Sequence, residues 1–198
     1  MYLDNYFFGI AAGALSVIAF TPYVFSIVKG ETRPSASSWW TWFLISLITT
    51  SSTWYAGATW AVLVLPVWLC FSYLVVSILS VKYGDNNWDL MNKFCVLGAL
   101  VGAILWWITG EPLVALVISI VADVFASIPN FRHVLKNPEQ ENRLGWTLGW
   151  GTALLELFAV SQWSFGSLAE SGWAVYFFLN MTIVLLLLWR ASAKKLVL

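Results

Sequence analysis

The sequence predicts an all-α membrane protein, on the basis of its composition, its long apolar segments and the one-sided distribution of its basic residues. Of the 198 residues, 60% are hydrophobic and 10% are charged, whereas a soluble domain has about 25% charged residues. A helix that crosses a bilayer needs roughly 20 mostly apolar residues, and seven such segments account for nearly the whole chain. We therefore expect a single membrane domain over residues 1–198 and no separate soluble domain.

The apolar segments define the expected transmembrane helices. Their approximate bounds are 6–28, 38–55, 58–80, 94–109, 113–135, 144–163 and 171–190. No Lys or Arg precedes Lys29, so the first segment lacks the basic start of a cleaved signal peptide. We therefore expect it to be the first membrane span.

The basic residues predict the orientation in the membrane. Seven alternating spans place all ten on one side, namely Lys29, Arg33, Lys82, Lys93, Arg132, Lys136, Arg143, Arg190, Lys194 and Lys195. Lys and Arg collect in cytoplasmic loops, and this bias sets topology. The N-terminus is thus predicted outside and the C-terminus in the cytoplasm. The compact chain and the lack of a targeting segment favour a bacterial cytoplasmic (inner) membrane.

Tryptophan is unusually frequent, with 14 residues. Many lie near predicted span ends, including Trp39, Trp42 and Trp146 on the inner side and Trp54 and Trp163 on the outer side. Such placement is typical of the aromatic belts at the two membrane interfaces. We therefore expect most of these side chains to face the interface.

The first and last parts of the chain form an internal repeat. An offset of 107 residues aligns Pro22 with Pro129, Lys29 with Lys136, and Trp39 with Trp146. Residues of about 6–80 then repeat as about 113–190, and the span at about 94–109 is a linker helix. Because each repeat has three spans, one linker span between them lets both repeats insert in the same direction. The repeats are therefore predicted to be parallel (3+1+3), as in some transporters. The two prolines each remove a backbone hydrogen bond and favour a kink, which predicts a pair of hinges.

The repeated motif resembles that of a known family. The first copy is Pro22-Tyr23 with Lys29, and the second is Pro129-Asn130 with Lys136, each followed by a Trp-rich helix start. At these residues the chain resembles the PQ-loop superfamily, which includes the SWEET-like (MtN3) sugar transporters; Tyr23 and Asn130 stand in place of the glutamine. The resemblance covers essentially the whole chain and implies seven helices in a 3+1+3 order. Vitamin transporters of the nicotinamide-riboside type share that order, but resemblance to them implies the opposite orientation.

Charged side chains within the spans are the first candidates for a site. Only Asp123 and Glu156 lie deep in spans, where a charge costs about 2.5–3.5 kcal/mol and by default marks a functional site. The other candidates are polar residues that share a helix face with Asp123 or Glu156, align with one of them in the repeat, or lie at a similar depth in the membrane. The predicted substrate- or proton-binding residues are Asp123, Glu156, Asn180, Ser127, Asn130, Ser16, Thr49 and Tyr176.

The chemistry of this set leaves alternatives open. The first alternative is that the two carboxyl groups, in a low-dielectric cavity, bind protons near neutral pH. The second is that they neutralise a cationic substrate. The third is that they are protonated packing residues. Resemblance to the SWEET branch implies substrate binding by Asn180, because that family has an Asn in the middle of its seventh helix. Resemblance to lysosomal PQ-loop amino-acid transporters implies proton coupling through Asp123. His133 is expected in a loop or interfacial role, and residues 139–143 are expected to form a solvated loop, with closure of an inner gate as the alternative.

Several function classes are unlikely on these grounds. The sequence has no cluster with metal-ligand spacing and no nucleophile–base set, so we expect neither an enzyme nor a cofactor. A net charge of zero and a membrane location argue against nucleic acid. We expect a transporter or facilitator of a small polar metabolite (sugar, amino acid or vitamin-like) by alternating access in the lipid bilayer, with protons as a candidate coupling ion. The alternative is a non-transporting receptor or scaffold on the same fold; substrate, direction and oligomeric state stay open.

Overall fold

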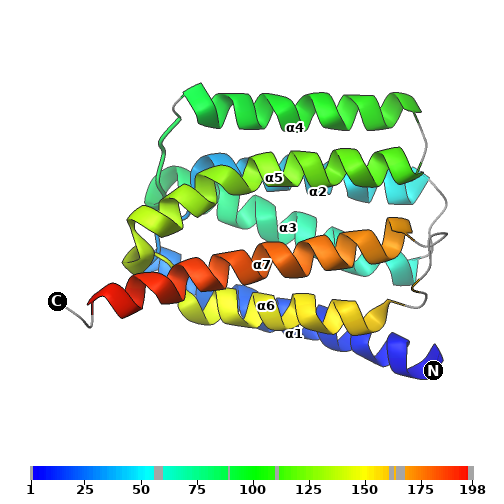
Figure 1. Ribbon diagram of the computed structural model, residues 1–198, viewed down its shortest axis with the longest axis horizontal. Helices are drawn as coiled ribbons and strands as arrows, with labels where there is room; N and C mark the ends of the chain where they lie inside the picture. The colour runs from blue at the N-terminus through cyan, green and yellow to red at the C-terminus, as the bar shows by residue number, and fades with distance from the viewer. Residues whose placement is uncertain are drawn as a thin grey trace. The chain divides into compact units, whose positions relative to one another are not determined.

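The described part of the chain is all-helical, as predicted. The computed structural model describes residues 2–55, 60–88, 90–109, 112–160, 163 and 168–195. Within these ranges the elements are α1 (Tyr2–Val28), α2 (Ala36–Tyr55), α3 (Trp60–Tyr83), α4 (Leu90–Thr109), α5 (Pro112–Lys136), the 3-10 helix η1 (Pro138–Gln140), α6 (Arg143–Ala159) and α7 (Leu168–Lys195) (Figure 1). Their only β-type pairing, within those ranges, is a single bridge between Ser35 and Asp85.

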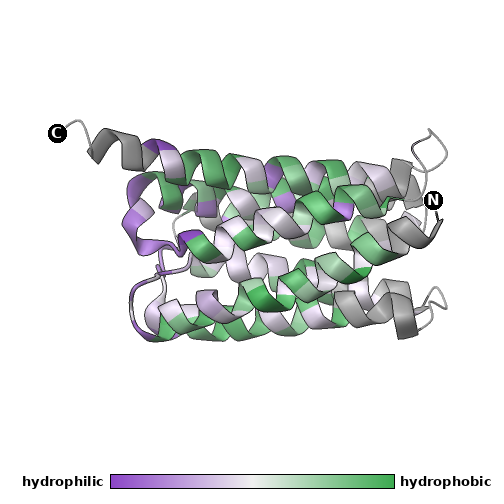
Figure 2. Ribbon diagram, turned by 90° about the horizontal axis from the view of Figure 1, so that it is seen from below, coloured by the Kyte–Doolittle hydropathy of each residue, from purple (hydrophilic) through white to green (hydrophobic). Residues whose placement is uncertain are grey.

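Among the residues that the structure describes, three helices are long and apolar enough to cross a membrane. These segments are Phe7–Val28 in α1, Val117–Lys136 in α5 and Ser171–Arg190 in α7, and α3 contains a shorter apolar stretch, Val67–Tyr83. Figure 2 shows hydrophobic residues along the lengths of the helices. Length and composition thus support association with a membrane, and the full set of seven spans stays a prediction.

Several large apolar side chains are exposed and several polar ones are buried, which differs from the usual pattern in a soluble protein. Phe7, Ile18 and Phe25 on α1 are more than half exposed, whereas Ser77 on α3 and Asn130 on α5 are fully buried. Soluble domains bury their large apolar residues and leave most polar ones at the surface. An exterior in contact with lipid explains this arrangement, because apolar side chains then lose nothing by exposure.

The chain divides into two compact units. Unit 1 comprises residues 1–32 and 134–198, and unit 2 comprises residues 33–133. In unit 1, α1 packs on α6 and α6 packs on α7; in unit 2, α2 packs on α3 and α4. The first helix of the chain is therefore grouped with the last two, and the units group the helices differently from the repeats predicted at about 6–80 and 113–190.

Small residues on α6 allow α1 to approach closely. A Cβ added at Gly145 would lie 3.0 Å from the Tyr23 ring, and one added at Gly151 would lie 3.1 Å from the Leu15 side chain. Small residues at a helix interface let two backbones pack tightly in membrane proteins. The glycines of α6 thus explain why its partner is α1.

The two helices that carry the aligned prolines of the repeat are continuous and are followed by short links. Pro22 lies inside α1 and Pro129 inside α5. The next helices begin at Ala36 and Arg143, two positions that the 107-residue offset also aligns. At the second start, the Asn142 side chain caps α6 by accepting a hydrogen bond from the Gly145 amide at 2.6 Å, which satisfies an end-of-helix donor.

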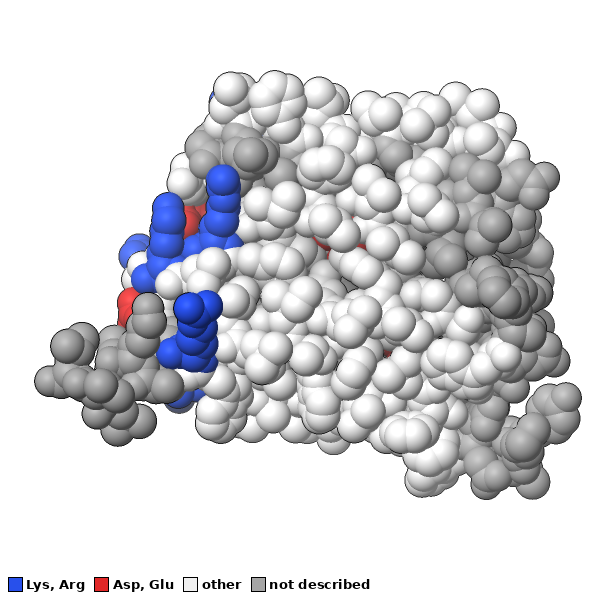
Figure 3. All heavy atoms as spheres, in the orientation of Figure 1, with Lys and Arg blue, Asp and Glu red and all other residues white. Residues whose placement is uncertain are grey.

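Basic residues in each unit gather at one end of the helices (Figure 3). In unit 1, α6 runs antiparallel to α1 and α7 (Figure 1), so the ends of α1 and α7 and the start of α6 coincide. The residues concerned are Lys29, Lys136, Arg143 and Arg190 in unit 1 and Arg33, Lys82, Lys93 and Arg132 in unit 2. The helix ends and links on one side of each unit therefore form its positively charged end.

The tryptophans divide into two groups. Trp54, Trp107 and Trp163 are at least 62% exposed, as expected for a belt, but Trp39, Trp42 and Trp146 are at most 9% exposed. The interfacial prediction is therefore wrong for these three. Trp39 packs edge-on against Tyr73 with ring centroids 5.7 Å apart, and Trp146 is part of the link structure described below.

Candidate functional site

A polar stripe on α5 contains three of the predicted site residues. Asp123, Ser127 and Asn130 follow at spacings of four and three, which places them on one face of the helix. The fully buried Ser127 hydroxyl donates to Asp123 Oδ2 over 3.4 Å, a long hydrogen bond. The predicted association of Asp123 with Ser127 is thus present in the structure.

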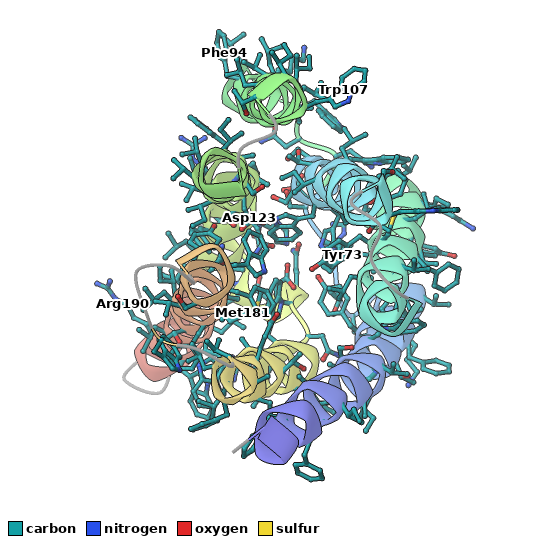
Figure 4. The ribbon with its side chains drawn as sticks, turned by 90° about the vertical axis from the view of Figure 1, so that its right-hand side faces the viewer. Tyr73, Phe94, Trp107, Asp123, Met181 and Arg190 are labelled. Atoms are coloured by element: carbon teal, nitrogen blue, oxygen red, sulfur yellow. The ribbon has the colours of Figure 1, made fainter. Side chains whose placement is uncertain are left out.

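Asp123 points toward the interior of unit 2. In Figure 4, Asp123 on α5 and Tyr73 on α3 extend inward, whereas Phe94 and Trp107 on α4 extend outward. Asp123 is half-buried, and Phe94 and Trp107 are 57% and 85% exposed. Within unit 2, therefore, the carboxylate belongs to the polar interior and the aromatic side chains of α4 belong to the apolar exterior.

Asn130, like Ser127, is a fully enclosed polar residue of the stripe. Its side chain is fully buried, and within the described ranges neither its amide nitrogen nor its amide oxygen has a hydrogen-bond partner. A buried amide without partners costs free energy, because it loses its hydrogen bonds to water. Asn130 is therefore well suited to bind a polar ligand that offers both a donor and an acceptor.

The stripe continues to His133, which lies in a helix and not in a loop, while an interfacial position stays a prediction. His133 lies on α5, is 3% exposed, and places Nδ1 3.1 Å from Oδ2 of Asp85. A carboxylate only accepts hydrogen bonds. The imidazole therefore carries a proton on Nδ1 and donates it to Asp85 in this contact. The spacing of three from Asn130 could have identified His133, but no local pattern points to Asp85, which is 48 residues away.

Asp85 is held in place by three further hydrogen bonds. Its amide donates to the Pro34 carbonyl at 2.9 Å, its carbonyl accepts from the Ala36 amide at 3.0 Å, and Oδ1 accepts from the Asn87 amide at 3.1 Å. Gly84 makes this pairing feasible, because a Cβ at that position would collide with the Pro34 carbonyl oxygen. The segments before α2 and after α3 thus fix the carboxylate that meets His133.

Unit 1 contains the other predicted polar residues near the middle of spans. Glu156 is half-buried on α6. On α7, Asn180 is 5% exposed and its amide nitrogen donates to the Tyr176 hydroxyl at 2.9 Å. The predicted grouping of Asn180 with Tyr176 is present, while the predicted pairing of Asp123 with Glu156 joins residues of different units and stays a prediction.

Of the two predicted equivalents in the first repeat, Ser16 is the one whose side chain the structure describes. Ser16 on α1 is half-buried and donates to the Gly13 carbonyl at 2.6 Å, so its hydroxyl is occupied within its own helix. Thr49 belongs to α2, but its side chain lies outside the described part of the structure.

The link between α5 and α6 contains a buried acidic residue, contrary to the prediction of a solvated loop. Glu139 and Arg143 are exposed, but Glu141 is 6% exposed. Its Oε2 accepts hydrogen bonds from Trp146 Nε1 at 2.8 Å and from the Tyr23 hydroxyl at 3.2 Å. Burial raises the pKa of Glu141 from 4.5 to about 7, although the two hydrogen bonds act in the opposite direction.

The same link contacts the predicted hinge residue of α1. The Asn142 side chain donates to the Pro22 carbonyl at 3.2 Å while its oxygen caps α6. Two successive residues, Glu141 and Asn142, therefore hold the link against the Pro22-Tyr23 motif.

A metal centre finds no support in the described ranges, which contain no group of three or more His, Cys, Asp or Glu residues suited to hold an ion. Comparison with known proteins identifies no relative: no family model, curated protein or solved structure matches the chain. The function is therefore argued from the geometry of the buried polar residues.

Proposed function

We propose that the protein is a transporter or facilitator of a small polar metabolite, such as a sugar, an amino acid or a vitamin-like compound, that works by alternating access. The observation that carries the proposal is the polar stripe on α5, from Asp123 through Ser127 and Asn130 to His133. At 1.5 Å per residue this stripe extends about 15 Å, or about half of a 30 Å hydrocarbon core. Polar side chains along so much of a membrane helix are functional by default, because they are costly to insert.

The proposed membrane arrangement is the 3+1+3 order of the PQ-loop superfamily, with the N-terminus outside and the C-terminus in the cytoplasm of a bacterial cell. Two features support it. The helices that start at Ala36 and Arg143 agree with the 107-residue offset, and each unit has its basic residues at one end, the end that the positive-inside rule assigns to the cytoplasm.

Each predicted site residue has a role in this proposal. Asp123 and Glu156 bind a proton or the cationic group of a substrate. Asn180 forms hydrogen bonds with the substrate, and the Tyr176 hydroxyl holds its amide in one orientation. Asn130 offers a donor and an acceptor at the level between Asp123 and His133.

Pro22 and Pro129 are the proposed hinges of the transport cycle. A proline inside a helix leaves one carbonyl without its helical donor and weakens the helix at that point. Pro22 lies inside α1 and Pro129 lies inside α5, so each helix is weakened in this way. Bending there would let the helices on either side of the site open alternately.

The test is uptake by proteoliposomes of a pool of radiolabelled sugars, amino acids and vitamins, with and without an inward-acid pH gradient. Uptake that follows the gradient and is lost in Asp123→Asn or Glu156→Gln is the expected result. Glu139→Gln, which alters an exposed carboxylate, is the matched control and should transport normally. Uptake that ignores the gradient and survives both substitutions indicates a facilitator with structural carboxyl groups. Absence of uptake for every compound supports the receptor or scaffold alternative.

A further inference from the structure

Glu141 stands out as an acidic side chain enclosed by neutral donors in the positively charged end of unit 1. The Tyr23 hydroxyl reaches it from α1 and Trp146 Nε1 reaches it from α6, both bonded to Oε2. It is 6% exposed although its neighbours Glu139 and Arg143 in the same link are exposed. A specific pocket of two aromatic side chains, rather than solvent, therefore surrounds this carboxyl group.

The other charged residues described at this end of unit 1 are exposed. These side chains are Lys29, Glu31, Lys136, Glu139, Arg143 and Arg190. The titratable group that faces Glu141 from α1 is Tyr23, which is itself buried. A buried carboxyl group in such surroundings is easier to accommodate when it is neutral, because ionisation requires solvation that the pocket does not supply.

The position of Glu141 connects its protonation to α1. The next residue, Asn142, donates to the Pro22 carbonyl and also caps α6. Gly145, one turn into α6, leaves the space that the Tyr23 ring fills. If the link moves away from α1, the hydrogen bonds to Tyr23 and Pro22 are lost together.

We propose that Glu141 is a proton-binding site, and that the bound proton keeps the α5–α6 link docked on the Pro22-Tyr23 segment of α1. Loss of the proton leaves a carboxylate that is better solvated outside the pocket, so the link undocks and releases the segment around Pro22. The proposal goes beyond transport, since the docked contact is internal to unit 1 and would operate equally in a receptor.

The expected direction follows from linkage. Burial raises the pKa of Glu141 to about 7 from an ordinary 4.5, so the docked form binds the proton more tightly than the undocked form. The ratio of docked to undocked link is then largest below pH 4.5 and falls as pH rises through about 7, by roughly 300-fold in all.

The experiment is hydrogen–deuterium exchange of the full chain in lipid nanodiscs from about pH 5 to about pH 8, corrected for intrinsic exchange rates. We expect peptides covering residues 137–146 and 20–26 to lose protection together as pH rises through about 7. Glu141→Gln, which is neutral at every pH, should remove the pH response, and Glu139→Gln should keep it. Infrared difference spectra should show a protonated carboxyl band that disappears with the same midpoint and is missing in Glu141→Gln.

A second variant keeps the proposal testable if Glu141→Gln does not fold. Tyr23→Phe removes a donor that favours the ionised carboxyl, so it should move the midpoint of both signals to higher pH. Protection that does not change with pH in the wild type would overturn the proposal, as would a response that Glu141→Gln retains or a midpoint that Tyr23→Phe lowers. Failure of the uptake assay would leave this result unaffected, because neither signal depends on a transported compound.

Discussion

His133 Nδ1 lies 3.1 Å from Asp85 Oδ2, a contact that joins the end of α5 to the segment after α3. The histidine side chain is 2% exposed and the aspartate side chain is 36% exposed. Because Asp85 is also bonded through its backbone to Pro34 and Ala36, this one pair connects three parts of unit 2. The pair should therefore contribute measurably to the stability of that unit.

A double-mutant cycle tests this contribution. We expect His133→Ala and Asp85→Ala each to lower the free energy of unfolding by about 1–3 kcal/mol, since each leaves a polar partner unsatisfied. The double variant should lose less than the sum, with a coupling of about 0.5–3 kcal/mol. Denaturant unfolding in detergent micelles measures all four proteins, and strictly additive losses would contradict a direct interaction.

Gly84 should not tolerate a methyl group. In Gly84→Ala the new Cβ would meet the Pro34 carbonyl oxygen, so we expect a loss of about 1–3 kcal/mol in unfolding free energy. Gly13→Ala is the matched control, because a Cβ there has nothing within 4 Å and Ala favours the helix. Equal thermal stability of the two variants would show that the close approach at Gly84 is not required.

The stability of the protein should depend on pH through Glu141. Its pKa in the folded chain, about 7, is above the ordinary 4.5, so its titration takes nothing from the stability below pH 4.5 and lowers the stability as pH rises through about 7. Relative to Glu141→Gln, the wild type should therefore lose up to about 3 kcal/mol between about pH 4.5 and pH 8. Glu139→Gln should follow the wild type, and parallel curves for wild type and Glu141→Gln would refute the expected linkage.

Substitutions on α7 should separate substrate binding from stability. Tyr176→Phe removes the hydroxyl that holds the Asn180 amide, and we expect roughly a tenfold rise in KM for uptake, equivalent to about 1.4 kcal/mol. Thr182→Val is the control: it removes the acceptor of the 2.9 Å hydrogen bond from Trp150 Nε1 and should lower the thermal stability with KM unchanged. A KM that responds to both variants alike would assign Tyr176 a purely structural role.

A lysine on the apolar face of α1 should impair membrane insertion. Ile18 is 58% exposed and lies near the middle of the segment Phe7–Val28, so Ile18→Lys should raise the apparent insertion free energy by about 2.5–3.5 kcal/mol. Ile18→Leu should insert as the wild type does. Insertion into microsomal membranes measures the difference, and normal insertion of the lysine variant would argue against a lipid-facing Ile18.

The helical class and the main apolar helices could be predicted because composition and length decide them. The segment predicted at 171–190 lies within α7, Leu168–Lys195, and that predicted at 6–28 lies within α1, Tyr2–Val28. Spacing along a single helix likewise identified Ser127 with Asp123 and Asn180 with Tyr176, pairs four residues apart. Such relations depend on helix geometry alone.

Contacts between distant segments were not predictable in the same way. Glu141 lies in a polar run that is typical of a solvated loop, but Tyr23, 118 residues away, encloses it. Helical periodicity indicates which residues share a face, yet it does not say which helix meets that face. For the same reason the packing of α1 on α6, which places the first helix in unit 1 with α7, was not apparent from the repeat.

That packing has a consequence for biogenesis. α1 ends at Val28, whereas its partner α6 begins at Arg143, so at about 5–20 residues per second the ribosome needs on the order of ten seconds to supply the partner. In the proposed membrane arrangement, α1 must persist in the bilayer without this partner during the interval, which an apolar helix with internally satisfied backbone groups can do. A nascent chain released before α6 should therefore contain every helix of unit 2, but α1 of unit 1 would lack its packing partner α6. Membrane quality control would encounter the chain in this form.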